Sequence, residues 1–137
     1  GHISKWNTSL VTNMKELFSQ KRNFNDDISK WNVSSVTDMS DMFAGEFESR
    51  GSFNGDISGW NVSSVSNMEC MFQDSPFNGD ISGWDVSSVT NMYRMFSSSQ
   101  FNGDISRWQI LICSWIVIFL KNTSRLKINK DRDRVSE

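Results

Sequence analysis

A tryptophan that returns about every 24 residues constrains the fold of this 137-residue chain more than any other feature. The spacings between successive members are 25, 29, 24 and 24 residues, and the members are Trp6, Trp31, Trp60, Trp84 and Trp108. The surrounding frame is complete in the copies at 24–43, 53–72 and 77–96 and partial at 3–18 and 101–108. The long interval contains an insertion at 45–51, for which we expect a surface loop. A unit this short cannot bury an apolar face alone, so we expect residues 1–108 to form one stack that continues in a longer protein.

Apolar spacing within the copy at 53–72 predicts one strand and one helix. Ile57, Trp60 and Val62 follow the L-x-x-L-x-L pattern, which is typical of a short strand, here near 59–62. The next apolar residues, spaced as on one face of a two-turn helix, are Val65, Met68, Met71 and Phe72. The sequence therefore predicts an α/β solenoid that resembles a leucine-rich repeat, with short parallel strands.

The apolar positions of the full copies predict the core. We expect it to include Trp31, Trp60, Trp84, Ile57, Ile81, Met68, Met92, Phe72 and Phe96. The tryptophans have a second interpretation as an exposed platform for sugar or peptide, and the methionines as an adaptable binding surface. Their helical or alternating spacing with other apolar residues favours burial in both cases.

Composition argues against several classes of function. The chain has 14 basic and 16 acidic residues, and residues 1–108 alone have eight against 13, a net charge of −5 without the basic stripe of a nucleic-acid binder. His2 is the only histidine, which leaves no histidine pair for a metal and no Ser-His triad. Phosphate-loop and dinucleotide motifs are absent from the sequence. We therefore expect no enzyme, no cofactor and no metal site.

Three smaller motifs each leave an alternative open. The turn at Asn54-Gly55-Asp56 and its copies either close each repeat with a ladder of side chains, which we favour, or bind calcium. Cys70 is either a small packed side chain, which we favour, or a reactive thiol. The chain has only one other cysteine, Cys113, and two cysteines are too few for a disulfide framework. The N-x-[ST] sequons reflect either repeat copying, which we favour, or glycosylation, and begin at Asn7, Asn32, Asn61 and Asn122.

Residues 109–137 depart from the repeat. An apolar run at 110–120 is followed by a charged segment. The whole tail contains six basic and three acidic residues. Three interpretations remain: a cap on the last repeat, a break in the reading frame or an unspliced stretch that gives non-native sequence, and membrane association. The apolar run is shorter than the roughly 20 residues that span a bilayer as a helix, so a spanning segment is not expected.

The frame F-N-G-D-I-S-G-W-[ND]-V-S-S-V-[TS]-[ND]-M-x-x-M-F resembles the BspA-like leucine-rich-repeat surface proteins and the related repeat of bacterial surface lipoproteins. This resemblance covers about residues 3–108. It implies a right-handed solenoid at the cell surface or outside the cell, with a role in adhesion. It carries no catalytic residue.

The leading hypothesis is a monomeric, non-enzymatic module of a surface or secreted protein that binds a protein or a glycan. Solenoids bind through extended surfaces, so exposed positions that vary between copies are the candidate ligand face. They are Lys30, Glu69, Tyr93, Arg94 and Arg107. The alternative is a purely structural spacer or stalk without a ligand of its own.

Overall fold

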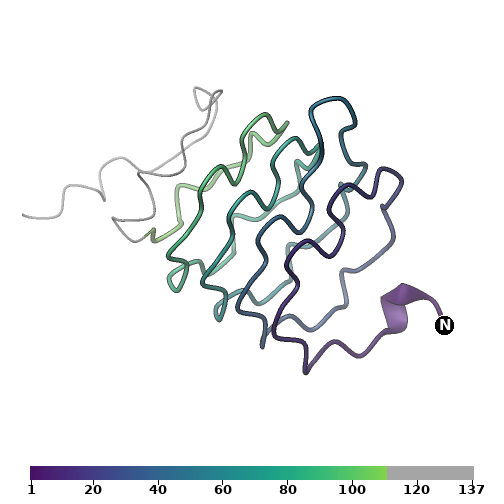
Figure 1. Cartoon of the computed structure of the whole chain (residues 1–137). Helices are drawn as coiled ribbons and strands as arrows, with labels where there is room; N and C mark the ends of the chain where they lie inside the picture. Colours follow the sequence, from purple (N-terminus) through teal and green to yellow (C-terminus); the bar gives the residue numbers. More distant parts are fainter. Residues whose placement is uncertain (111–137) are drawn as a thin grey trace, which may run out of the picture.

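The computed structural model describes residues 1–110, which form a stack of irregular coils with one coil for each copy of the repeat (Figure 1). Among these residues the only helix is η1, a 3-10 helix at Ile3–Lys5. The bridges between coils are isolated residue pairs, all parallel, and join Asn13 to Asp38, Asp38 to Asn67 and Asn67 to Asn91. The described part of the chain therefore has no sheet, and successive coils are joined by single bridges and turns.

The predicted α/β solenoid, with its leucine-rich-repeat strand near 59–62, is wrong. In place of a strand, the Trp60 N–H donates to the carbonyl of Ile57 at 3.1 Å, and the Val65 N–H donates to that of Val62 at 2.9 Å. Two tight turns in succession cannot run extended along a neighbouring strand. The L-x-x-L-x-L spacing instead serves these turns, which bring Ile57, Trp60 and Val62 into the core.

The predicted helix after Val65 is also wrong. Alternate N–H groups here leave the local chain: those of Met68, Cys70 and Phe72 donate to carbonyls of the following coil at 2.8, 2.7 and 2.9 Å. An α-helix would need the same groups for bonds to the residue four positions earlier. Cys70 also has a φ of 53°, which a right-handed helix excludes. Its equivalents Glu16, Asp41 and Arg94 have φ values of 57°, 56° and 53°.

We call residues 13–20, 38–45, 67–74 and 91–98 the ladder segments, because they carry these inter-coil bonds. The first bond of each interface runs from Met14 to the Asp38 carbonyl at 2.9 Å, from Met39 to that of Asn67 at 2.9 Å, and from Met68 to that of Asn91 at 2.8 Å. In these bonds the N–H belongs to the earlier coil and the carbonyl to the later one, whereas just before each segment the direction is reversed, as when the Thr37 N–H donates to the Thr12 carbonyl at 2.8 Å. Bonds of both directions therefore join each pair of successive coils.

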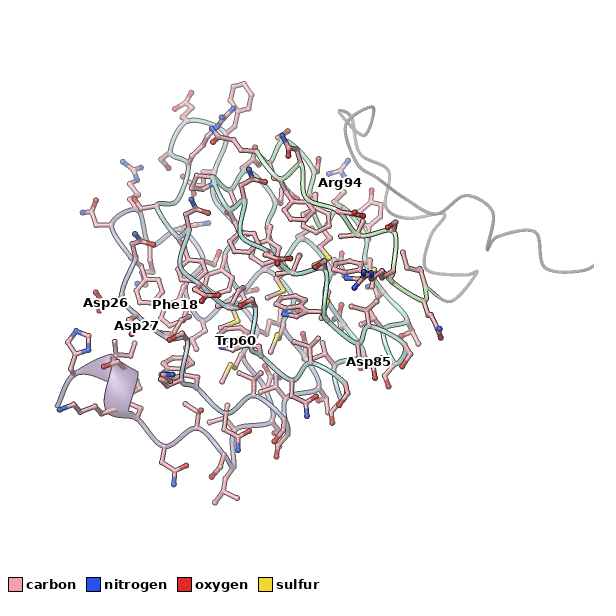
Figure 2. All side chains as sticks on the ribbon, turned by 180° about the vertical axis from the view of Figure 1, so that it is seen from behind. Phe18, Asp26, Asp27, Trp60, Asp85 and Arg94 are labelled. Carbon is pink, nitrogen blue, oxygen red and sulfur yellow. The ribbon has the colours of Figure 1, made fainter. Side chains whose placement is uncertain are left out.

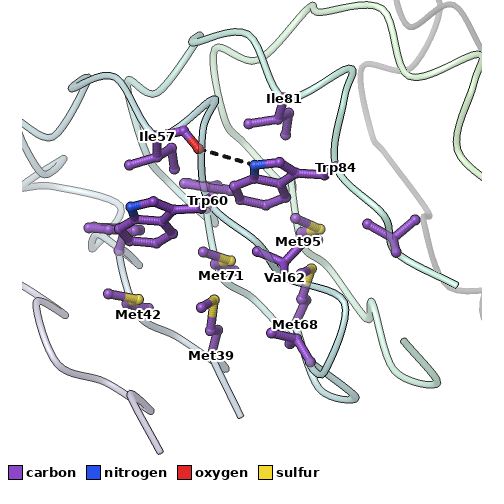
Figure 3. Packing of buried hydrophobic residues seen from close by; sticks show 14 of the residues in the cluster. Met39, Met42, Ile57, Trp60, Val62, Met68, Met71, Ile81, Trp84 and Met95 are labelled. Atoms are coloured by element: carbon purple, nitrogen blue, oxygen red, sulfur yellow. Dashed lines mark hydrogen bonds between the residues drawn. The ribbon is translucent and has the colours of Figure 1, made fainter. Parts of the chain in front are cut away.

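Columns of identical side chains form the core. The nine residues predicted for it are all buried, each with an exposed fraction of 5% or less. Phenylalanine rings of successive coils stack, with centroids 5.6 Å apart for Phe43 and Phe72. Each buried indole within residues 1–110 also bonds to the previous coil, as when Trp84 Nε1 donates to the Ile57 carbonyl at 3.1 Å (Figure 3). The methionines of neighbouring coils fill the space beside these rings (Figure 3).

Short polar motifs close the turns between core positions. Asp56 Oδ1 accepts from the N–H and the hydroxyl of Ser58 at 3.0 and 2.7 Å. In the sequon that begins at Asn61, the Asn61 Oδ1 accepts in the same way from Ser63, and the equivalent Asp85 does so from Ser87. Asx side chains often close turns in this way. Because aspartate serves equally well, the fold requires the acceptor oxygen, and this accounts for a repeated N-x-S without an attached glycan.

The insertion at 45–51 forms a surface turn in which Glu46 and Ser49 exchange backbone hydrogen bonds at 3.3 and 3.0 Å. Phe47 at its tip is 88% exposed. No helix within residues 1–110 is long and apolar enough to cross a bilayer. The interpretations of the tail, Cys113 and the Asn122 sequon fall on residues beyond 110 and lie outside the described part of the chain.

Candidate functional site

Each ladder segment carries one pair of adjacent side chains that differs from copy to copy, and we call these pairs the variable column. The pairs are Lys15–Glu16, Ser40–Asp41, Glu69–Cys70 and Tyr93–Arg94. Main-chain bonds align them: the N–H groups of Glu16, Asp41 and Cys70 donate to the carbonyls of Ser40, Glu69 and Tyr93 at 2.9, 2.8 and 2.7 Å. The backbone therefore fixes where each pair lies, while its side chains are not required by the frame.

The Tyr93–Arg94 pair is the most accessible part of the two later coils in this column. Tyr93 is 44% exposed, Arg94 is exposed, and the Arg94 guanidinium carbon lies 5.2 Å from the centroid of the Tyr93 ring. That distance permits a cation–π interaction, which holds the two side chains together. Glu69 in the preceding coil is half-buried, and its Oε2 accepts a hydrogen bond from Asn91 Nδ2 at 3.0 Å.

The middle of the variable column is acidic. Burial raises the pKa of Asp41, and the charges of Glu16 and Glu69 raise it further. Burial raises the pKa of the Cys70 thiol to about 11, with smaller contributions from Asp41 and Glu69. A thiol with this pKa is neutral near pH 7 and is a poor nucleophile. The environment of Cys70 therefore favours a packed side chain over a reactive one.

The structure divides the predicted ligand face into two groups. Lys30 and Arg107 are exposed just before their tryptophans, where Gly59 and Gly83 stand in the coils between them. The charges near Lys30 are those of Asp27 and Asp56. Figure 2 shows Asp27 and Arg94 at well-separated parts of the molecule. Lys30 and the Tyr93–Arg94 pair therefore do not belong to one compact site.

The stacked N-G-D turns use their oxygens within the fold. The Asn54 N–H donates to Asn25 Oδ1 at 2.9 Å, and the N–H groups of Asn78 and Asn102 continue this ladder at 2.8 and 2.9 Å. Hydrogen bonds from Ser58 lower the pKa of Asp56. No group of three or more His, Cys, Asp or Glu side chains within residues 1–110 is arranged to hold a metal ion. The asparagine oxygens that would bind calcium are thus taken by the next coil.

A sequence comparison places this repeat in a known family. Residues 1–108, and in a second match 44–131, fit the profile described as Mycoplasma protein of unknown function, DUF285. The chain belongs to the DUF285 family. No curated protein and no solved structure matches it. The DUF285 description states no activity, so the chemistry of the site has to come from the residues of this chain.

The sequence frame of this DUF285 chain did not reveal which apolar side chains are exposed. Trp6 is 58% exposed and Leu17 is 42% exposed, although Trp31 and Met42 at the equivalent positions of the next coil are buried. Both lie in the first coil, at the end of the stack that carries η1 (Figure 1). The available signal was position in the array, because one side of the first coil has no neighbour among residues 1–110. Phe47 was missed as well, and its signal was its place within the insertion.

Proposed function

We propose that this chain is a non-catalytic binding module of a surface or secreted protein, which binds a protein or a glycan through the variable column. The observation that carries the proposal is the Tyr93–Arg94 pair, exposed and in mutual contact at 5.2 Å. Tyrosine and arginine are frequent anchors of binding interfaces. The fold uses only the backbone at these two positions, so their side chains are available for recognition.

Variation within a constant frame supports the same proposal. The second residue of each pair is Glu16, Asp41, Cys70 or Arg94, whereas the methionine two positions before it is the same in every coil. A position at which the frame does not require one particular side chain can change its charge without loss of the stack. The resemblance to BspA-like surface proteins, several of which are implicated in adhesion to host or matrix proteins, supports a binding role outside the cell.

The chemistry of the column indicates what kind of ligand fits. Arg94 and the Tyr93 ring suit a carboxylate or sulfate group beside an apolar or sugar face. Glu69, one coil away, suits a hydroxyl or basic donor. An acidic glycan or a protein loop that carries both signs of charge matches this sequence of groups.

The test is a binding screen of the full chain against a glycan array and against purified extracellular-matrix proteins. For any ligand that binds, we expect Arg94→Ala to weaken the affinity at least about tenfold, or about 1.4 kcal/mol. Arg107→Ala is the matched control, because it removes the same side chain from the other exposed group, and we expect it to bind as the wild type does.

Each result decides between named alternatives. Loss of binding in the Arg107 variant instead would move the site to the positions before the tryptophans. Equal binding by both variants would exclude the variable column as the ligand site. A screen without any ligand would favour a structural spacer.

A further inference from the structure

An asparagine or aspartate lies two positions before each pair of the variable column and orients that pair. Its Oδ1 accepts a hydrogen bond from the N–H of the first residue of the pair, at 2.8, 2.8, 3.0 and 2.9 Å for Asn13, Asp38, Asn67 and Asn91. An Asx turn of this kind needs only the oxygen. Because Asp38 closes its turn as the asparagines do, the side-chain amide of an asparagine remains available here for another contact.

Asn91 uses its side-chain amide for such a contact. Its Nδ2 donates to Glu69 Oε2 in the preceding coil at 3.0 Å, so one side chain holds both the Tyr93 backbone and the Glu69 carboxylate. The coil before Asn67 offers no carboxylate, because Ser40 stands at the place equivalent to Glu69. The Asn67 amide has no acceptor within residues 1–110. Asn91 therefore makes a contact that the closing of its turn does not require.

Two charged side chains of the variable column have opposite signs and lie in neighbouring coils. The Cys70 N–H donates to the Tyr93 carbonyl at 2.7 Å, which places the Glu69–Cys70 pair next to the Tyr93–Arg94 pair. Burial raises the pKa of Cys70 most, the charges of Asp41 and Glu69 raise it further, and that of Arg94 lowers it. The carboxylate of Glu69 and the guanidinium of Arg94 thus act on one and the same thiol, and they attract each other.

Glu69 and Arg94 nevertheless form no ion pair with each other in the described part of the chain. The carboxylate is held by Asn91, and the guanidinium carbon lies 5.2 Å from the centroid of the Tyr93 ring. Each charge therefore has an uncharged partner, which fixes its place without neutralising it. Both charges stay available to a ligand.

The geometry points to Asn91 as a positioning residue of the ligand site, which keeps Glu69 apart from Arg94, and to a protein surface with adjacent basic and acidic groups as the partner. This inference rests on the proposed function, since it concerns the same variable column. A glycan that carries only carboxylate or sulfate charges would be attracted by Arg94 but repelled by Glu69 and, one coil earlier, by Asp41. A protein surface carries both signs of charge, so it can complement the acidic coils and Arg94 together.

The positioning role can be tested without a ligand. In the isotope-labelled full chain, NMR measures the hydrogen exchange of the side-chain amides of Asn91 and Asn67, which are both half-buried. We expect the bonded Asn91 proton to exchange at least about tenfold more slowly than those of Asn67, because its acceptor is charged. Glu69→Ala removes this acceptor and should abolish the difference. Equal exchange of the two amides in the wild type would refute the contact and the role built on it.

Asn91→Asp tests what the contact does for binding. The variant keeps the oxygen that closes the turn, as Asp38 does naturally, but it has no donor for Glu69. We expect Glu69 to leave the new carboxylate and to pair with Arg94, which would weaken the binding of a protein ligand at least about tenfold. Asn67→Asp is the matched control, because it adds the same charge at the equivalent position of the preceding coil without the loss of a donor. It should bind as the wild type does, and urea unfolding should show that both variants fold. Unchanged affinity of the Asn91 variant would exclude the positioning role.

Two kinds of probe test the class of partner: a panel of purified extracellular-matrix proteins, and hexuronate oligomers with and without sulfate groups. We expect at least one protein to bind, with an affinity that falls at least about tenfold in Glu69→Gln and in Arg94→Gln alike, and no oligomer to bind up to about 1 mM. An oligomer that binds, or a protein that needs Arg94 but tolerates Glu69→Gln, would overturn the inferred partner and leave the proposed function standing. Binding by neither kind of probe would overturn both.

Discussion

Replacement of Trp60 by alanine tests how the stack is held together. Trp60 is 4% exposed, and truncation of a buried aromatic side chain to alanine costs about 3 to 5 kcal/mol. Its Nε1 also donates to the Ile28 carbonyl at 3.2 Å, which adds about 1 kcal/mol. In the variant, the Ile28 carbonyl still accepts a hydrogen bond from the Trp31 N–H at 3.1 Å, so the substitution adds no free-energy cost for an unpaired buried carbonyl. We therefore expect a loss of about 4 to 6 kcal/mol in the free energy of unfolding, close to the whole stability of a small domain.

Urea unfolding followed by the fluorescence of the remaining tryptophans measures this loss. Trp6→Ala is the matched control, because the same substitution is made at the equivalent position of the first coil. Trp6 is 58% exposed, and we expect its replacement to lower the free energy of unfolding by only about 1 to 2 kcal/mol, which corresponds to the buried part of the side chain. The reasoning fails if Trp60→Ala costs less than about 2 kcal/mol, or if the two variants are equally destabilised.

Three further predictions concern single positions. Gly45→Ala should lower the free energy of unfolding by about 1 to 3 kcal/mol, because a Cβ there would lie 2.4 Å from the Asp74 carbonyl oxygen; an unchanged urea midpoint would contradict this. Hydrogen bonds lower the pKa of Asp80 in the folded state, so its stabilising effect is present above the unfolded pKa of about 3.9 and is lost as the pH falls below it. Asp80→Asn keeps the acceptor and removes this titration, so its urea midpoint should fall less than that of the wild type between pH 6 and pH 3. With Cys113 replaced by serine, Cys70 should react with iodoacetamide at pH 8 far more slowly than free cysteine, since its pKa is about 11, and unfolding should restore the ordinary rate.

The sequence predicts the apolar columns better than it predicts the local backbone. A column needs the same kind of side chain at the same place in every coil, and the spacing of Trp60, Trp84 and Trp108 displays this directly. Apolar residues spaced by three, six and seven positions predict a helix, but consecutive tight turns give the same spacing. What decides between them is a positive φ at Cys70 and Arg94, and neither residue type signals it. The inter-coil hydrogen bonds offset the cost of that conformation, and they are visible only once the coils are stacked.

The same limit applies to the variable column and to the exposed side chains of the first coil, for opposite reasons. The variable column can be found by searching for positions where the copies differ, as with Tyr93 and Arg94. Trp6 is exposed but occupies a frame position, so a comparison of copies assigns it to the core. Substitution in the variable column should therefore change ligand binding with little effect on stability. Substitution of frame residues should instead lower stability in proportion to burial, which is why the same change from tryptophan to alanine should cost far more at position 60, 4% exposed, than at position 6, 58% exposed.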